Sequence, residues 1–303
     1  MFMYAAGLSA ATRLNTELKL GMWGLKAVKA DRQYQLSCFP AITEKAASWK
    51  DLLRLCPGQL LTNLFLYKPV RRRHIFRRAA LKFLRLLSID TCERRLPSRE
   101  KRPFPYLSRF QRVYFTPNDY HEFHRIVDDT ILLGFWANAG YFENVEGLLR
   151  KKFTFSQECF DEELLHKVIT CNSVALHVRR GDKVNNKSFK PSTIPYLKAS
   201  LEKISSLTHK PVFFVFSDGM DWCKETLPKL SDAEFHFIEG HTPPQDMAIM
   251  TKCKHVIVAP SHFSWWGAWL NDNPGKIIIT PYSDTEAFSR TAENTQVFYC
   301  PID

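Results

Sequence analysis

Short apolar segments alternate with helix-like stretches through the second half of this chain, and this alternation constrains the fold more than any other feature. Five segments have the length and apolar character of buried strands: 173–178, 212–216, 234–238, 255–259 and 276–280. Four helical stretches lie among them: 194–207, 220–230, 245–253 and 264–270. Strands that alternate with helices form a parallel sheet through right-handed crossovers. The second half is therefore predicted to be a doubly wound α/β domain.

The first half has a weaker pattern. Residues 2–15 predict a helix rich in small side chains, and residues 16–20 predict a short strand after it. Residues 74–89 place basic and bulky apolar side chains at helical spacing, which predicts an amphipathic helix. With 303 residues, the chain has the length of two domains rather than of one or four.

Composition excludes several classes of protein. Hydrophobic residues make up 45% and charged residues 24% of the chain, which is typical of a folded globular protein and not of a disordered or fibrous one. No uncharged apolar run reaches the roughly 18 residues that a membrane span needs. The eight cysteines are scattered without a Cys-x-x-Cys pair, which favours free thiols in a reducing compartment and argues against a metal site.

Most of the net charge lies in one segment. Of the formal charge of +11, residues 68–102 contribute +10, because they hold 13 basic and three acidic residues. Such a block predicts a polyanionic partner. Two interpretations stay open: a helix that lies in the interface of an anionic membrane, and a charged helix face that is merely solvated. Nucleic acid is disfavoured, because the block contains no recognisable nucleic-acid-binding motif.

Polar clusters follow the first four predicted strands, at the point where each strand ends. They occupy residues 177–182 (HVRRGD), 217–219, 239–241 and 260–264. One such cluster would mean little, because Asp and Ser often cap helices. Four of them at the carboxyl edge of one parallel sheet, where open α/β sheets bind their ligands, predict a ligand site.

Two features of this edge suit a diphosphate. Residues two apart in a strand share a face, so His177 and Arg179 should point together, and Arg180 should point away. A guanidinium makes bidentate contacts to phosphate, and a helix that opens at 261–264 presents backbone N–H groups to an anion. Neither a Walker-type loop nor a G-x-G-x-x-G motif is present, which disfavours nucleoside triphosphatases and nicotinamide enzymes.

Two groups of residues at this edge also have structural interpretations. For Arg180, a salt bridge to Asp182 or to another carboxylate is as well supported as a contact to ligand. The three tryptophans Trp265, Trp266 and Trp269 are expected to pack in the core rather than to stack on a ligand.

The residues of this edge carry a family resemblance. The motif His177-Val-Arg-Arg-Gly-Asp182 resembles the His-x-Arg-Arg-x-Asp donor motif of fucosyltransferases that use GDP-fucose. Residues 174–189, 214–227 and 246–271, which include the stretch FSWWGAWLN, look like the bacterial form of the α-1,2-fucosyltransferase family, glycosyltransferase family eleven. Residues 134–155 fit the same family. The resemblance spans most of the chain and is weakest from about residue 35 to 110.

The resemblance implies a GT-B fold, in which two Rossmann-like domains face a cleft. Residues 1–160 would form the acceptor-side domain, with a basic helical insertion at 68–102, and residues 161–303 would bind the GDP-sugar. The opening sequence MFMYAAGLSAATRLNTELKL matches the family just after its usual Gly-x-Gly-Asn-Gln turn, so the N-terminal domain is expected to be incomplete.

The resemblance also assigns roles to residues. It implies a donor site made of His177, Arg179, Arg180, Ser217, Asp218, Asp246, Ser261, Phe263 and Ser264. In this site Arg179 would contact the β-phosphate, His177 the guanosine side, and the region of Ser261 and Ser264 the pyrophosphate. Asp218 or Asp246 would shape the nucleotide pocket. Arg179 and Asp182 are the candidate catalytic residues, and the general base is left open among Asp182, Asp218 and His262.

The activity implied is an inverting transfer of L-fucose from GDP-fucose to the 2-hydroxyl of a galactoside in a surface glycan, without a metal or another cofactor. The acceptor of such enzymes can be lipid-linked, which predicts a cytoplasmic protein in peripheral contact with the inner face of the membrane through residues 68–102. Three positions depart from the family pattern, namely Gly219, Pro260 and His262. Because of these departures and the missing turn, a folded but inactive remnant that binds GDP-sugar is the alternative.

Overall fold

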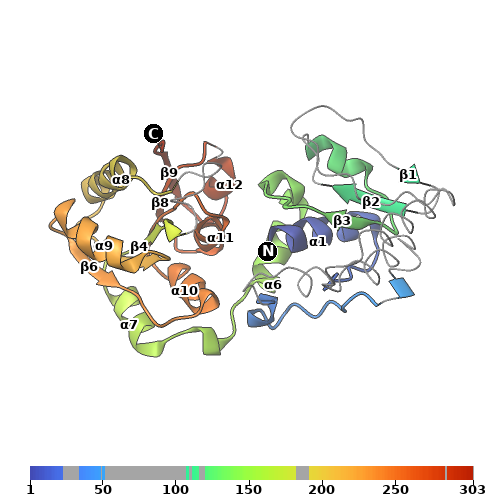
Figure 1. Ribbon diagram of the computed structural model, residues 1–303, viewed down its shortest axis with the longest axis horizontal. Coiled ribbons are helices and arrows are strands. Elements are labelled where there is room, and N and C mark those ends of the chain that lie inside the picture. Colours follow the sequence, from blue (N-terminus) through green and yellow to red (C-terminus); the bar gives the residue numbers. More distant parts are fainter. Residues whose placement is uncertain are drawn as a thin grey trace, which may run out of the picture. The chain divides into compact units, whose positions relative to one another are not determined.

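The computed structural model describes residues 1–22, 34–48, 50–51, 107–108, 111–115, 120–181, 191–283 and 285–302 (Figure 1). The chain forms two compact units, which are described separately. Unit 1 comprises Met1–Tyr34 and Ile42–Leu149, and unit 2 comprises Gln35–Ala41 and Arg150–Asp303. The predicted helix 74–89, the basic block 68–102 and Asp182 lie outside the described residues.

Unit 2 contains a six-stranded parallel sheet. Its strands are β4 (Ser173–Val178), β5 (Val212–Ser217), β6 (Glu234–Phe237), β7 (His255–Ile257), β8 (Ile277–Thr280) and β9 (Gln296–Tyr299). Their order across the sheet is β6-β5-β4-β7-β8-β9. The chain therefore moves outward from β4 through β5 to β6, and then returns to the other side of β4 with β7. This confirms the predicted doubly wound α/β class, and adds β9 to the predicted strands.

Helices cover both faces of this sheet. On one face Val174, Leu176 and Val178 of β4 share a buried core with residues of helices α8 (Ile194–Leu207) and α9 (Met220–Thr226). On the other face the ring of His177 lies 5.4 Å from that of Phe263 in α11 (His262–Leu270). All six residues of β4 are buried, as are the four of β8. Strands covered on both faces have continuous apolar runs, and these runs made them visible in the sequence.

The helices of unit 2 follow the predicted stretches with local shifts. Their bounds are α7 (Glu162–Thr170), α8 (Ile194–Leu207), α9 (Met220–Thr226), α10 (Pro243–Met250), α11 (His262–Leu270) and α12 (Glu286–Ser289), with 3-10 turns at Leu36–Cys38 and Gln157–Cys159 and a short α6 (Glu146–Lys152) at the junction of the units. The predicted helix 220–230 was too long: α9 ends at Thr226 and the 3-10 turn Leu227–Lys229 follows, because Pro228 cannot donate a helical hydrogen bond. The helix predicted at 245–253 begins earlier, because the Gln245 carboxamide accepts from the Thr242 backbone N–H at 2.9 Å and caps the helix there.

The tryptophans of α11 pack in the core as predicted. Trp265, Trp266 and Trp269 are 7%, 2% and 0% exposed. The six cysteines in the described parts of the chain are free thiols. Among the described residues, no helix combines the length and the hydropathy required to cross a bilayer.

Unit 1 is built around a buried helix and a small sheet (Figure 1). Its elements are α1 (Phe2–Leu14), β1 (Leu107–Ser108), β2 (Gln111–Phe115), β3 (Ile131–Leu133) and the 3-10 turns η2 (Tyr120–Arg125), η3 (Ala139–Tyr141) and η4 (Glu143–Val145). Strands β2 and β3 pair in parallel. Helix α1 is buried on every side from Tyr4 to Ala11, and its small side chains let it pack closely.

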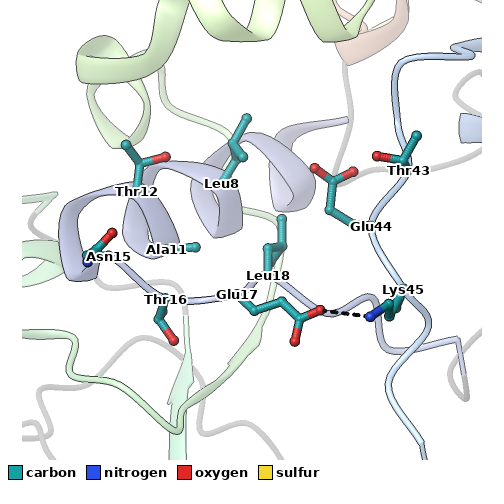
Figure 2. Close-up of a pocket in the computed structure, with 10 residues that line it drawn as sticks. All are labelled: Leu8, Ala11, Thr12, Asn15, Thr16, Glu17, Leu18, Thr43, Glu44 and Lys45. Carbon is teal, nitrogen blue, oxygen red and sulfur yellow. Dashed lines mark ion pairs between the residues drawn. The ribbon is translucent and has the colours of Figure 1, made fainter.

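The strand predicted at 16–20 was wrong. Helix α1 ends at Leu14 and is capped by Asn15, whose φ of 51° lies in the left-handed region. The chain then makes a single parallel bridge between Leu20 and Ala46. One bridge leaves too few paired residues to form a strand. A pocket of about 420 Å³ lies beside this segment, lined by α1, by residues 16–18 and by residues 43–45. Figure 2 shows the ion pair between Glu17 and Lys45, 3.8 Å apart, among its lining residues.

Candidate functional site at the carboxyl edge of the parallel sheet

The loops after β4 and β7 define the site. These two strands are neighbours in the sheet, but the chain leaves them toward opposite edges. Loops that part in this way open a crevice at the carboxyl ends of the strands, which is where open α/β sheets bind ligands. Arg179 and Arg180 follow β4, and Ser261 with α11 follows β7.

Asp218 joins the loops after β4 and β5. Its Oδ2 atom lies 2.6 Å from Arg179 Nη1, and its Oδ1 atom accepts from the Arg180 backbone N–H at 2.8 Å. The side chains of Arg179 and Asp218 are about a quarter exposed, at 25% and 26%. The ion pair is thus partly desolvated, and it fixes the direction of the Arg179 guanidinium.

Small residues let the loops after β4 and β5 approach each other. A Cβ atom on Gly181 would lie 2.3 Å from Asp218 Oδ2, so any larger residue would displace the carboxylate. Ser217 Oγ donates to the Val178 carbonyl at 2.8 Å and accepts from the Gly219 N–H at 3.0 Å. The hydroxyl of Ser217 therefore braces the two strand ends, and Gly219 completes the turn.

Arg180 and Arg179 have different side-chain partners, and both lie in the loop after β4. Its guanidinium carbon lies 3.9 Å from the centre of the Trp222 ring, and its Nη1 donates to the Ser192 carbonyl at 3.2 Å. Within the described residues this side chain stacks on an aromatic ring and does not pair with a carboxylate. The alternative pairing with Asp182 concerns a residue outside that range.

Helix α11 presents its N-terminus at the same edge. Ser261 caps it, with Oγ accepting from the Phe263 N–H at 3.3 Å, and its first turn contains no acidic residue. Ser264 is fully buried, and its Oγ accepts from the Ala259 N–H at 3.1 Å. The hydroxyl of Ser264 thus holds the loop between β7 and α11, and the backbone N–H groups of the first turn provide the positive end of the helix.

Cations neutralise the opposite end of α11. Arg150 Nη2 donates to the Trp269 carbonyl at 2.6 Å, and its guanidinium stacks on the Trp269 ring at 4.3 Å. Lys276 Nζ donates to the carbonyls of Ala268 and Asn271. Burial lowers the pKa of Lys276 to about 7. These contacts compensate the negative end of the helix dipole, while its positive end carries no matching acid.

Asp246 lies in α10, beside His241 in the loop after β6. The two side chains approach at 3.6 Å, and His241 also lies 3.8 Å from Asp161 at the start of α7. Burial raises the pKa of Asp246 to about 6, and the nearby His241 opposes the rise. The sequence placed His241 in a polar cluster, but nothing in it linked that cluster to Asp161, because the two are 80 positions apart.

The structure thus groups the predicted residues into three sets. The first contains Arg179, Arg180 and Asp218, which are linked by direct contacts, and Ser217, which bonds the Val178 carbonyl beside them. The second contains His177, Phe263, Ser261 and Ser264 at the start of α11. Asp246 forms the third with His241. Among the described residues, no group of three His, Cys, Asp or Glu side chains could hold a metal ion.

The fold is that of a doubly wound α/β protein, in which Arg179 and the N-terminus of α11 follow the two strands where the strand order reverses. The chain belongs to glycosyl transferase family 11, whose model matches residues 117–299. This confirms the family resemblance stated from the motifs.

Individual proteins show the same relationship. The chain is 40% identical over 158 residues to an alpha-1,2-colitosyltransferase of Escherichia coli, a match that covers 49% of this chain and 54% of that protein. It is 38% identical over 104 residues to galactoside alpha-(1,2)-fucosyltransferase 2 of Mus musculus, covering 32% and 30% of the two chains. A crystal structure of POFUT1 in complex with GDP aligns with a TM-score of 0.41 at 13% identity, over 97% of this chain and 93% of that chain. The chain spans about half the length of the first bacterial relative.

Proposed function

We propose that this chain is an inverting glycosyltransferase that moves L-fucose from GDP-fucose to the 2-hydroxyl of a galactoside. The observation that carries the proposal is the Arg179–Asp218 pair at the carboxyl end of β4, with the N-terminus of α11 following the neighbouring strand β7. A fixed guanidinium and a helix N-terminus are the two elements that bind a diphosphate most directly.

In this proposal the donor lies across the crevice. Arg179 contacts the β-phosphate, and Asp218 orients it by holding Nη1. The first turn of α11 receives the pyrophosphate, and His177 with Phe263 borders the guanosine side. Asp246 shapes the nucleotide pocket from α10.

The reaction requires the departure of GDP. The acceptor 2-hydroxyl oxygen forms a bond to C1 of the fucosyl group, the bond between C1 and the phosphate oxygen breaks, and the hydroxyl proton passes to a base. The charge that develops on the leaving GDP is stabilised by Arg179, which is already aligned by Asp218 and needs no reorganisation. For the base, Asp182 and His262 stay open. Asp218 is better suited to positioning, because its two oxygens contact Arg179 and the Arg180 N–H.

The test is a transfer assay on the purified chain. GDP-fucose and a β-galactoside acceptor are supplied, and GDP release and the product linkage are measured by coupled assay and by NMR. We expect an α-1,2-fucosylated product, with and without EDTA. Transfer to another hydroxyl, or loss of activity with EDTA, would contradict the proposed linkage or the proposed independence of metal.

A second donor has a specific observation in its favour. The 40% identity to an alpha-1,2-colitosyltransferase makes GDP-colitose a candidate for the same site. Running the assay with both donors in competition decides between them by the ratio of the two kcat/KM values.

The alternative proposal is a remnant that binds GDP-sugar without transferring it. Calorimetry with GDP-fucose combined with the transfer assay separates the two proposals, since an enzyme and a remnant both bind the nucleotide and only the enzyme forms product. Binding without product over many hours would favour the remnant.

The basic block 68–102 supports a separate proposal, that the protein contacts anionic membrane on the cytoplasmic side. Each basic residue near an anionic surface contributes about 1 kcal/mol, and salt screens this attraction. Cosedimentation with anionic and neutral vesicles at low and high salt tests it. Salt-sensitive binding to anionic vesicles alone is expected, and equal binding to both kinds would contradict it.

A further inference from the structure

Phe135 is the most exposed large hydrophobic side chain in the described part of the chain. It is 80% exposed, in a protein where other large apolar side chains of the same unit are mostly buried. It lies in the loop that joins β3 to η3, one residue after Gly134. Isolated exposed apolar residues are common on protein surfaces, so exposure alone would assign nothing to it.

The backbone around Phe135 is held in an unusual conformation. Gly134 has a φ of 120° and Trp136 a φ of 51°, so left-handed residues flank Phe135 on both sides. Positive φ is uncommon for a bulky residue such as tryptophan, and such strain persists only where the surrounding structure imposes it. Strained positions of this kind concentrate at functional sites.

The surrounding structure imposes this conformation through Trp136. Its side chain is fully buried, and its ring lies 5.9 Å from that of Phe123 and 5.2 Å from that of Tyr141. The Trp136 carbonyl accepts from the Asn138 N–H at 2.9 Å, and Asn138 Oδ1 accepts from the Gly140 N–H at 2.8 Å. Burial of Trp136 thus directs Phe135 outward and fixes the loop that carries it.

The position of the loop in unit 1 is the second observation. Strand β3 pairs in parallel with β2, and Phe135 comes two residues after β3 ends at Leu133. It therefore lies at the carboxyl edge of a parallel strand pair, the edge at which α/β sheets bind ligands. An exposed aromatic ring on a backbone held in this way is a contact surface with little backbone entropy to lose on binding.

We infer that Phe135 contacts the sugar acceptor, with its ring against the apolar C–H face of the galactoside. This inference rests on the proposed function, because it assumes that the second substrate is a sugar. The chemistry fits: one face of a pyranose such as galactose is lined by C–H groups, and an uncharged ring covers that face without competing for its hydroxyls. A protein partner fits less well, because one ring beside Ala137 and Asn138 offers far less area than a stable protein interface buries.

Three variants test the inference. Phe135→Ala removes the ring, Phe135→Tyr keeps it, and Tyr299→Ala removes an aromatic side chain of unit 2 that is 53% exposed. Binding of a β-galactoside disaccharide is measured by NMR titration, with and without saturating GDP, and binding of GDP is measured by calorimetry. We expect Phe135→Ala to weaken disaccharide binding by about tenfold, the upper range for one aromatic contact. The Phe135→Tyr and Tyr299→Ala variants should bind the disaccharide about as tightly as the original protein does. The affinity for GDP should not change in any of the three variants.

Kinetics provide the second readout. Phe135→Ala should raise KM for the acceptor and leave KM for GDP-fucose unchanged, which a general loss of structure would not do. Thermal unfolding should be unchanged, because the side chain makes little contact with the fold. Unaltered disaccharide binding in Phe135→Ala overturns the inference, as does absence of disaccharide binding in the original protein.

Two further outcomes keep this inference separate from the proposed function. If the chain binds the disaccharide through Phe135 but neither binds GDP nor forms product, the proposed function fails and the sugar contact stands. If Phe135→Ala alters self-association in sedimentation and leaves disaccharide binding intact, the residue belongs to a protein interface and the inference is wrong.

Discussion

Unit 2 and unit 1 are stabilised in different ways. Unit 2 has six parallel strands, and its central strand β4 is buried along its whole length. In unit 1 the described strands have two to five residues, and long-range side-chain bonds connect the elements. Ser9 Oγ donates to Asn144 Oδ1 at 2.6 Å, and Arg13 Nη2 donates to the Ile126 carbonyl at 2.8 Å. Regular strand pairing therefore supports the carboxyl edge of the sheet in unit 2, whereas single side chains fix the loops of unit 1.

The largest effect is expected at the carboxyl edge of the parallel sheet in unit 2. Arg179→Ala should lower kcat/KM by about 10²–10³, the usual cost of losing one preorganised group that stabilises developing charge. Arg179→Lys should not restore the activity, because an ammonium lacks the planar fork that Asp218 orients. The control is Arg290→Ala, which removes a surface arginine paired with Glu286 at 3.0 Å. Near-normal turnover in Arg179→Ala would exclude the assigned role.

Removing the buried cation behind α11 should have the next largest effect. Lys276→Met leaves the carbonyls of Ala268 and Asn271 without their donor, and each buried unsatisfied carbonyl costs about 1–3 kcal/mol. We expect the free energy of unfolding to fall by about 2–4 kcal/mol in urea titrations. Lys198→Met, at an exposed position of α8, serves as the control and should change stability little. Equal stability of both variants would show that Lys276 does not secure the helix.

Alanine substitutions at two glycines distinguish the cost of close packing from the effect of helix propensity. Gly181→Ala introduces a Cβ atom 2.3 Å from Asp218 Oδ2, so the carboxylate and Arg179 must move. We expect a loss of about 1–3 kcal/mol in stability, the usual cost of overpacking, together with weaker GDP binding by calorimetry. Gly147→Ala in α6 has nothing within 4 Å of the new Cβ atom and should be neutral or stabilising. If both variants bind GDP equally well, the close approach at Gly181 is not needed for the site.

Asp246 should show a pH dependence. Burial raises its pKa to about 6 in the folded protein, above the value near 3.9 of an unfolded chain. The folded state therefore holds more protons between these values, so this group lowers stability as the pH rises from about 4 to 6. The Asp246→Asn substitution removes this loss of stability. The variant should therefore be more stable than the original protein by about 1–3 kcal/mol at pH 7.5, and equally stable below about pH 4. Denaturant titrations at these pH values measure the effect, with Glu202→Gln on the exposed face of α8 as the control.

The same substitution probes the donor site. If Asp246 shapes the nucleotide pocket, the Asp246→Asn variant should bind GDP more weakly although it is more stable. This combination is common where a buried charge serves function at a cost in stability. A variant that is less stable than the original protein at pH 7.5 would contradict the cause assigned to the pKa.

The smallest effect is expected in unit 1. Ser9 is buried in α1, and Ser9→Ala removes its hydrogen bond to Asn144, which should cost about 1 kcal/mol. Ser206→Ala in α8, whose hydroxyl bonds only its own helix, is the control and should cost less. An equal effect of the two substitutions would mean that this long-range bond does not distinguish unit 1.

Apolar periodicity predicted strands β4 to β8 of unit 2 and the positions of four of its helices, but not α7, α12 or β9. Helix α8 has the predicted bounds, and so does β4, because a strand buried on both faces and an amphipathic helix each leave a pattern within one window of sequence. In unit 1 the predicted strand at 16–20 was wrong and β2 and β3 were missed, since short strands and turns depend on partners far along the chain.

Within the site, the sequence predicted that Arg179 and Arg180 differ in direction, on the assumption that the strand extends through them. In the structure β4 ends at Val178, so both arginines lie in the loop that follows it. Only the tertiary structure decided their partners: Asp218 for Arg179, and Trp222 for Arg180. It also placed β7 beside β4, so that the start of α11 follows a strand next to the one that Arg179 follows, and it assigned Lys276 to the far end of that helix. The physical reason is that periodicity records which face of an element is buried, whereas strand order and the pairing of charges arise from contacts between segments tens of residues apart.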